Sequence, residues 1–206
     1  MNLPNLITLT RLLLTAGVFV CLELSPSHAT VSEAPSPEVR DRLSVHIDET
    51  LVWIAFALFL VAAVTDFVDG WLARRWNLVT AFGRVADPFA DKVLIAGSLV
   101  TLLKFPNAMT VLTTWYVVVV IAREFLVTAI RGVVEASGRP FPADKLGKWK
   151  MVSQCWTVAA LITMVAGTDV WVWAAQWGFW ISLVLTVVSG LNYVVKARDV
   201  LFAGAT

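Results

Sequence analysis

The 206-residue sequence has little charge, few cysteines and few histidines. Charged residues make up 15% of the chain and the net charge is +1, which gives no basis for nucleic-acid binding. Cys21 and Cys155 both fall within apolar runs, so they indicate neither a metal site nor a disulfide framework. His28 and His46 share one polar stretch, where histidines are typically solvated. The abundant residues are hydrophobic, 58% of the chain, and they indicate a membrane protein.

Long apolar runs predict the helices of this protein. A run of about 20 apolar residues is long enough to cross a bilayer as a helix. Runs of this kind cover residues 5–24, 51–74, 88–105, 108–135, 149–167 and 171–196. We therefore expect an all-α membrane protein with six transmembrane helices. Residues 1–206 would form a single domain, with residues 25–49 as an outer loop.

The basic residues predict the orientation of these helices. Lysines and arginines gather in or beside the segments between helices two and three, between helices four and five, and after helix six. Only Arg40, Arg42 and Lys104 fall on the opposite side. Because basic residues concentrate in cytoplasmic loops, both termini are expected in the cytoplasm.

The first apolar run has an alternative interpretation as a cleaved signal peptide. The tripeptide "SHA" at residues 27–29 has the small residues of a cleavage site. However, no lysine or arginine precedes the run, and Arg11 interrupts it. These features favour a retained helix over a signal peptide.

The stretch "TDFVDGWLARRW", residues 65–76, places two carboxylates at the end of an apolar run, where ionisable groups are usually functional. Its helical spacing continues into a second group after a short connection. The two stripes consist of Asp66, Asp69, Gly70, Ala73 and Arg74, and of Gly83, Asp87 and Asp91. Antiparallel helices joined by a short connection are neighbours, so the four aspartates are expected to converge.

Four converging carboxylates repel one another unless they are protonated or neutralised. Hard divalent cations are the usual partners of sites built only from carboxylate oxygens, and a phosphate substrate favours Mg²⁺ or Mn²⁺. Two such ions can clamp a diphosphate during phosphoryl transfer. Gly70 and Gly83 leave room on the same faces for a nucleotide, and Arg74 can bind phosphate oxygens. The competing interpretation, in which each aspartate is an interfacial cap or an ion-pair partner, explains single residues but not the whole pattern.

This spacing of aspartates, glycines and arginine resembles the signature of the CDP-alcohol phosphotransferases at every position. The resemblance implies that Asp66, Asp69 and Asp87 bind a first divalent ion. It also implies that Asp66, Asp87 and Asp91 share a second ion, and that Asp91 is the catalytic base. Homodimerisation is implied by the resemblance alone.

The resemblance extends over nearly the whole chain. In "NLPNLITLTRLLL", Asn5 and Thr8 would join Gly70, Arg74 and Gly83 at the CDP group, although helix capping explains Asn5 and Thr8 equally well. The stretches "AREFLVTAIRG" and "LGKWKMVSQ" are similar to later basic motifs of the family. The chain departs from those motifs at Gly132 and Met151, where an acidic residue and a threonine are common, and its outer loop is long.

Basic residues in the second half predict a phosphorylated acceptor. Arg123 and Arg131 are turned by only about 80° from each other on an ideal helix, so both can face one cavity, whereas the neighbouring Glu124 is expected to point elsewhere and to serve another helix. Lys148 and Lys150 lie in a basic cluster that fits an anionic acceptor or, equally well, anionic lipid headgroups.

The resemblance to the family implies a reaction that transfers the phosphatidyl group of CDP-diacylglycerol to glycerol 3-phosphate. Its products are phosphatidylglycerol phosphate and CMP, and its place is the bacterial inner membrane. Inositol phosphate and phosphatidylglycerol are alternative acceptors for the same fold. A cation-coupled transporter is an alternative from another class, but the sequence has neither inverted repeats nor carboxylates distributed along a path. A purely structural protein is a third alternative.

Overall fold

The computed structural model of the chain describes residues 3–25, 49–65, 81–138, 145–168 and 171–201. Every regular element within these ranges is a helix, so the all-α prediction is confirmed for this part of the chain. The elements are α1 (Leu3–Leu24), the helix Glu49–Thr65, α4 (Ala81–Leu102), α5 (Pro106–Met109), α6 (Thr114–Ala136), α7 (Lys145–Val165) and α8 (Val172–Leu201).

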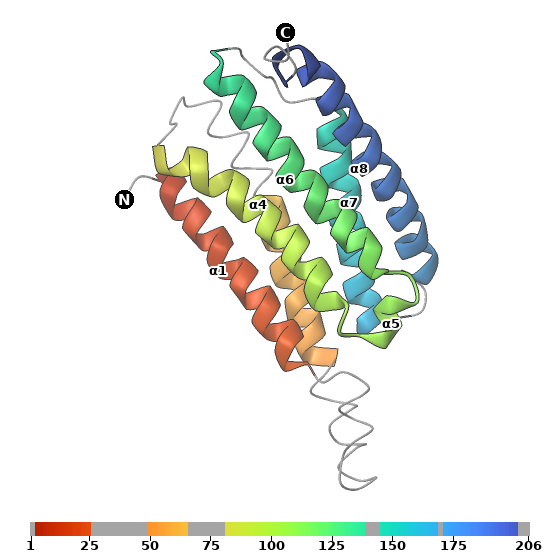
Figure 1. The fold of residues 1–206 in the computed structure, drawn as a ribbon. Coiled ribbons are helices and arrows are strands. Elements are labelled where there is room, and N and C mark those ends of the chain that lie inside the picture. The colour runs from red at the N-terminus through yellow and green to blue at the C-terminus, as the bar shows by residue number, and fades with distance from the viewer. Residues whose placement is uncertain (1–2, 26–48, 66–80, 139–144, 169–170, 202–206) are drawn as a thin grey trace, which may run out of the picture.

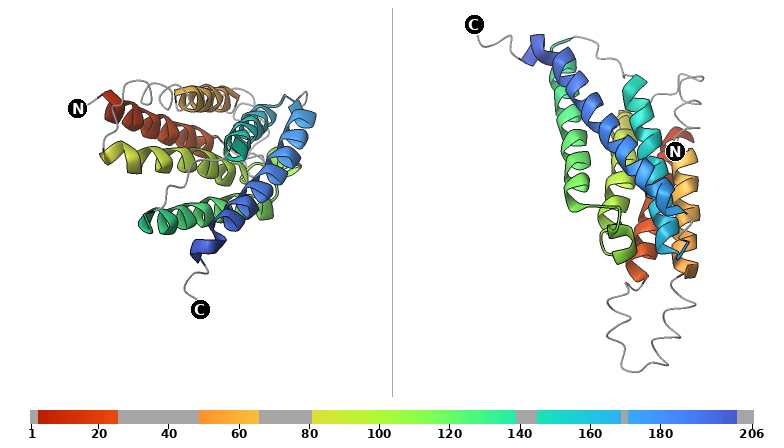
Figure 2. Two further views of the ribbon diagram at one scale, coloured as in Figure 1. Left: turned by 90° about the horizontal axis from the view of Figure 1, so that it is seen from above. Right: turned by 90° about the vertical axis from the view of Figure 1, so that its right-hand side faces the viewer.

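The long helices run roughly alongside one another and form a bundle (Figure 1). Seen from above, α1, α4 and the helix Glu49–Thr65 make one group, and α6, α7 and α8 make the other (Figure 2). Helix α4 contacts both α6 and α7 and so joins the two groups. The chain enters α1, α4 and α7 at the same end of the bundle, which is also where α6 and α8 finish (Figure 1). We call this end the polar end, because it carries the residues of the candidate site described below.

Helix α4 begins at Ala81, so the predicted start at residue 88 was wrong. The early part of α4, "AFGRVADP", contains charged residues and a proline, and a search for apolar runs does not detect such a segment as helix. Pro88 therefore lies inside the helix, where its missing N–H removes one backbone hydrogen bond without ending the element. As a result Gly83, Asp87 and Asp91 all belong to one helix.

The predicted helix 108–135 is confirmed from residue 114 onward, but its predicted start was wrong, because the chain breaks between α5 and α6. Phe105 and Thr113 both have extended backbone conformations that precede a new helix start. Thr110, Val111 and Thr113 are β-branched residues, which weaken helix propensity over this stretch. Helix α6 therefore runs from Thr114 to Ala136, and it does not have the extra length that the continuous apolar run predicted.

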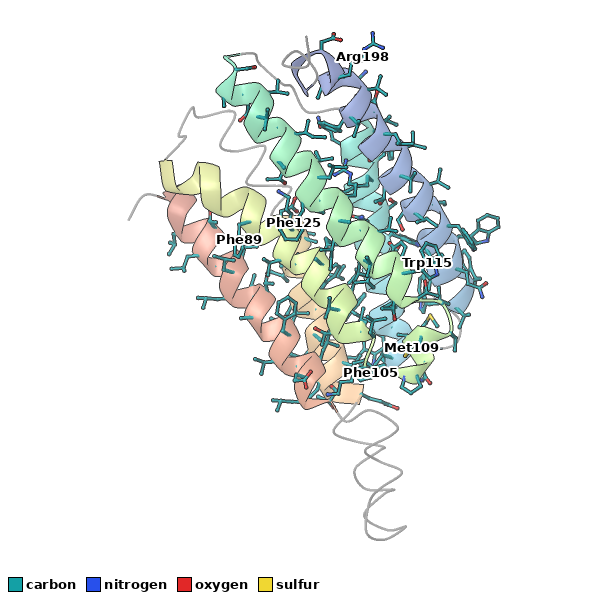
Figure 3. The ribbon with its side chains drawn as sticks, in the orientation of Figure 1. Phe89, Phe105, Met109, Trp115, Phe125 and Arg198 are labelled. Atoms are coloured by element: carbon teal, nitrogen blue, oxygen red, sulfur yellow. The ribbon has the colours of Figure 1, made fainter. Side chains whose placement is uncertain are left out.

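Within the described residues, one helix is long and apolar enough to cross a bilayer, the segment Val172–Asp199 of α8. The helix Glu49–Thr65 is also apolar but shorter. Large apolar side chains are exposed around the bundle, among them Phe89 at 60% and Phe125 at 73% (Figure 3). Soluble monomers rarely expose so many large apolar side chains, whereas a lipid environment favours them.

Helices α7 and α8 make close contact at Gly178. A Cβ atom added at Gly178 would lie 2.8 Å from Thr157 Oγ1 and 3.3 Å from Thr157 Cα. We therefore expect Gly178→Ala to push the two helices apart and to lower the free energy of unfolding by about 1 to 3 kcal/mol. Thermal unfolding in detergent measures this effect.

Gly132→Ala in α6 is the matched control, because a Cβ there meets no atom within 4 Å. Alanine is the better helix former by about 1 kcal/mol, so this control should be neutral or stabilising. Equal melting temperatures for the Gly178→Ala variant and the unchanged protein would show that the helices do not depend on this close contact.

Candidate active site

The part of the aspartate motif that lies on α4 falls at the polar end of the bundle. Gly83, Asp87 and Asp91 lie in the first turns of α4 at a spacing of one helical turn, which is the register that the sequence predicted. The surroundings of Gly83 and the side chain of Asp87 lie outside the described part of the chain. Four further predicted site residues, Asp66, Asp69, Gly70 and Arg74, lie outside the described residues altogether.

Asp91 lines a small pocket between α4, α6 and α7. Its carboxylate is half-buried. The residues that line the pocket are Asp91, Lys92, Ile95, Ala96, Val120, Glu124, Lys150, Met151 and Gln154. Three of the long helices therefore bring acidic and basic side chains together beside the predicted catalytic base.

A buried ionic network connects this pocket to α8. Lys150 Nζ of α7 donates to Glu124 Oε1 of α6 at 2.5 Å, and Arg123 Nη1 donates to the same oxygen at 3.1 Å. Arg123 Nη2 donates to Ser189 Oγ of α8 at 3.0 Å. The three charged side chains are 15% exposed or less, so water screens their attraction only weakly.

The network corrects one prediction and confirms another. Glu124 does serve another helix, as predicted, because it binds Lys150 of α7. However, it does not point away from Arg123, because the two side chains form an ion pair. Neighbouring residues of a helix diverge by about 100° at their Cα atoms, but long side chains can bend back toward a shared partner.

Arg131 lies two helical turns from Arg123 on α6, toward the polar end. Its Nη2 donates to the hydroxyl of Tyr193 on α8 at 3.2 Å. The ring of Tyr193 also lies under both guanidinium groups, with ring-centroid distances of 5.7 Å to Arg123 Cζ and 5.9 Å to Arg131 Cζ. The two arginines therefore share a contact on α8, and neither of them lines the pocket beside Asp91.

The two lysines that the sequence grouped with these arginines differ in position. Lys150 is buried in the network, whereas Lys148 is exposed at the start of α7. Two of the residues that the sequence predicted to bind the CDP group, Asn5 and Thr8, lie in α1. Thr8 is buried there, and the side chain of Asn5 is not among those that the structure describes. The structure thus links Arg123 to Lys150 through Glu124 and to Arg131 through Tyr193, and it leaves Lys148 on the surface.

Divalent metal ions fit this site only if its side chains supply suitable ligand atoms. Among the side chains that the structure describes, no three histidines, cysteines, aspartates or glutamates gather as a metal site would require. Of the four motif aspartates, Asp91 is the one whose side chain is described, and it lies half-buried at a pocket, as a ligand facing a bound ion would. Carboxylate oxygens suit Mg²⁺ or Mn²⁺, so Asp91, the one described donor of the motif, is of the chemical type that such ions bind.

Sequence reasoning missed Ser189, Tyr193 and Gln154. Ser189 and Tyr193 are four residues apart in "SGLNY" and share one face of α8. Gln154 of α7 is 2% exposed and donates to Thr186 Oγ1 of α8 at 3.1 Å. Polar residues spaced by one helical turn inside an apolar run could have identified these residues, because buried polar side chains need hydrogen-bond partners.

Comparison with known proteins identifies a single family. The sequence matches the CDP-alcohol phosphatidyltransferase family over residues 1–188. A Bacillus subtilis protein named CDP-diacylglycerol–glycerol-3-phosphate 3-phosphatidyltransferase is 37% identical, and the match covers 97% of each chain. Proteins of the same name from Rickettsia felis, 30% identical over 93% of each chain, and from Escherichia coli K12, 37% identical over 72% of this chain and 82% of the relative, also match.

These matches agree with the motif residues and with the helical fold. The family match covers every aspartate of the motif and extends through α7 into α8. The family is one of membrane-associated transferases, which is consistent with the apolar segment Val172–Asp199. The chain therefore belongs to the CDP-alcohol phosphatidyltransferase family.

Proposed function

We propose that this protein transfers the phosphatidyl group of CDP-diacylglycerol to glycerol 3-phosphate, forming phosphatidylglycerol phosphate and releasing CMP. The names of the bacterial relatives support both substrates. The observation that carries the proposal is that Lys150 lines the Asp91 pocket and shares Glu124 with Arg123. Arg123 in turn shares the ring of Tyr193 with Arg131. A phosphomonoester dianion needs basic partners of this kind, whereas choline, ethanolamine or serine does not.

Asp91 is the proposed catalytic base. In the reaction, the primary hydroxyl oxygen of glycerol 3-phosphate forms a bond to the β-phosphorus of CDP-diacylglycerol, and the bond from that phosphorus to the oxygen bridging to CMP breaks. Asp91 accepts the proton of the attacking hydroxyl, and the electron pair of the broken bond leaves with CMP. A base in this role lies within hydrogen-bond reach of the hydroxyl.

The motif aspartates Asp66, Asp69, Asp87 and Asp91 would hold two divalent ions, Mg²⁺ or Mn²⁺. When bound, such ions neutralise charge on the diphosphate and stabilise the attacking and leaving oxygens. Residues proposed at the CDP group are Asn5, Thr8, Gly70, Arg74 and Gly83. Arg123, Arg131, Lys148 and Lys150 are proposed to bind the acceptor phosphate, with Lys148 acting from the surface.

The proposed setting is the inner membrane of a bacterium, crossed six times, with both termini in the cytoplasm. The bacterial sources of the relatives and the placement of basic residues support this topology. The lipid tails of CDP-diacylglycerol would then stay in the bilayer while its diphosphate meets the aspartates at the interface. A homodimer, implied by family resemblance, would form within the same membrane.

CMP release by purified protein tests the proposed acceptor. The protein in detergent would receive CDP-diacylglycerol and Mg²⁺ with glycerol 3-phosphate, inositol phosphate, phosphatidylglycerol or serine in separate reactions. We expect release with glycerol 3-phosphate and at most a few per cent of that rate with the other three. Faster release with inositol phosphate or phosphatidylglycerol would keep the family chemistry and reject the proposed acceptor.

A further inference from the structure

The side chain of Tyr193 is the common contact of the two arginines of α6. It is buried at 3% exposure on α8. Its ring faces both guanidinium groups, at 5.7 and 5.9 Å, and its hydroxyl accepts a hydrogen bond from Arg131 at 3.2 Å. None of the roles assigned above uses this residue.

The two arginines contact the same tyrosine ring although they lie far apart along α6. Arg123 and Arg131 are eight residues apart on α6, which corresponds to a rise of about 12 Å along the helix axis. Both guanidinium groups nevertheless lie within 6 Å of one ring. Tyr193 is therefore a contact that two arginines share although they lie far apart along the backbone.

The arginines keep hydrogen-bonding capacity after these contacts are made. The Nε atoms of Arg123 and Arg131 are buried, and neither donates a hydrogen bond to any side chain or carbonyl in the described ranges. A buried donor without an acceptor is unfavourable, and an anion bound between α6 and α8 would supply acceptors for both. Two cations that contact the same ring and keep spare donors suit a doubly charged phosphate.

One glycine allows α8 to approach this cluster closely, and a glycine of α7 lies beside it. A Cβ atom at Gly190 of α8 would lie 3.1 Å from Arg123 Cγ, so a side chain there would displace the arginine. A Cβ at Gly147 of α7 would lie 4.0 Å from the Tyr193 hydroxyl. The hydroxyl therefore lies where α6, α8 and the first turn of α7 meet, next to the turn that carries Lys148 and Lys150.

We propose that Tyr193 is a positioning residue that holds the guanidinium groups of Arg123 and Arg131 together for the phosphate group of the acceptor. It acts through the arginines and does not touch the reacting atoms. This inference rests on the proposed function, since it assigns the same pocket to a phosphorylated acceptor. Its consequence is that Tyr193 determines affinity for the acceptor and leaves affinity for CDP-diacylglycerol unchanged.

Two substitutions separate the hydroxyl from the ring. Tyr193→Phe keeps a ring beneath both guanidinium groups but removes the acceptor for Arg131, and we expect it to raise KM for glycerol 3-phosphate about fivefold to tenfold. Tyr193→Leu removes the ring as well, and we expect an increase of about 30-fold or more. KM for CDP-diacylglycerol should stay within about twofold of the original value in both variants, since no CDP contact is assigned to this region.

Tyr116→Phe is the matched control, because it removes a buried tyrosine hydroxyl from the same pair of helices. Tyr116 and the Ser182 hydroxyl of α8 lie 2.7 Å apart, well away from the arginines along α6. Tyr116→Phe should lower the melting temperature without changing KM for glycerol 3-phosphate. If Tyr193→Phe behaves in the same way, Tyr193 only packs α8 against α6, and the inference is overturned.

Direct binding separates this inference from the proposed function. Calorimetric titration of glycerol 3-phosphate into purified protein measures the dissociation constant of the acceptor in the absence of turnover. Tyr193→Phe should weaken this binding about fivefold to tenfold. Equal binding by the Tyr193→Phe variant and the original protein would overturn the role of Tyr193. Failure of the proposed function has a different signature, which is absence of CMP release by the original protein with glycerol 3-phosphate.

Discussion

Replacing Asp91 with asparagine is expected to reduce CMP release at least about 1,000-fold, because general-base catalysis alone contributes about 100-fold to 10,000-fold. Asparagine has nearly the same shape, so the half-buried position beside α6 and α7 should remain packed. It neither accepts a proton nor brings negative charge to a divalent ion. The decrease should therefore appear in kcat, measured at saturating concentrations of both substrates.

Asp199→Asn is the control for the loss of one aspartate charge. Asp199 lies near the end of α8, where its exposed carboxylate receives a hydrogen bond from Arg198 Nε at 3.3 Å. Exposed pairs of this kind contribute little to stability, so this variant should keep its activity and melting temperature. An Asp91→Asn protein that is folded and retains more than about a tenth of the original kcat would remove Asp91 from the role of base.

Replacing Glu124 with glutamine is expected to damage both stability and activity. Glu124 is the carboxylate that Lys150 and Arg123 share, and all three side chains are buried. Neutralising it leaves two buried cations side by side, and breaking a buried ion pair typically costs about 3 to 5 kcal/mol of folding free energy. Lys150 lines the same pocket as Asp91, so CMP release should also fall by about 100-fold or more when its partner is lost.

Glu135→Gln near the end of α6 is the matched control, since Glu135 is exposed on the same helix and should tolerate the change. A double variant with Glu124→Gln and Lys150→Gln separates stability from activity. Removing one cation together with the carboxylate should recover part of the lost stability but leave CMP release low. If Glu124→Gln unfolds at the same temperature as Glu135→Gln, the buried network does not stabilise the bundle.

Helix existence could be predicted from the sequence because apolar runs report burial and length directly. The ends of the helices could not be predicted in this way, because they depend on local sequence features that the apolar runs do not reveal. The polar start of α4 is one example, where Arg84 and Pro88 interrupt the apolar pattern although the backbone continues as helix. The break before Thr114 is the opposite case, because apolar residues continue through it.

The candidate site could also be predicted from the sequence only in part. The motif on α4 could be predicted because helical spacing fixes which residues share a face, and the nearness of Arg123 and Arg131 followed from the same rule. Their contact with Tyr193 could not be predicted, because Tyr193 is 62 residues from Arg131 along the chain. Only the packing of α8 on α6 brings Tyr193 to Arg131. Long-range pairs of this kind depend on the tertiary arrangement and leave no periodic signal.

The central claim is that glycerol 3-phosphate is the acceptor of the phosphatidyl group, and the most direct test follows that molecule itself. Purified protein would be incubated with CDP-diacylglycerol, Mg²⁺ and radiolabelled glycerol 3-phosphate, and the lipids would then be extracted and separated. We predict that the label enters phosphatidylglycerol phosphate in equimolar amount to the CMP released. Label that stays in the aqueous phase, while CMP is released with another acceptor, would contradict the account.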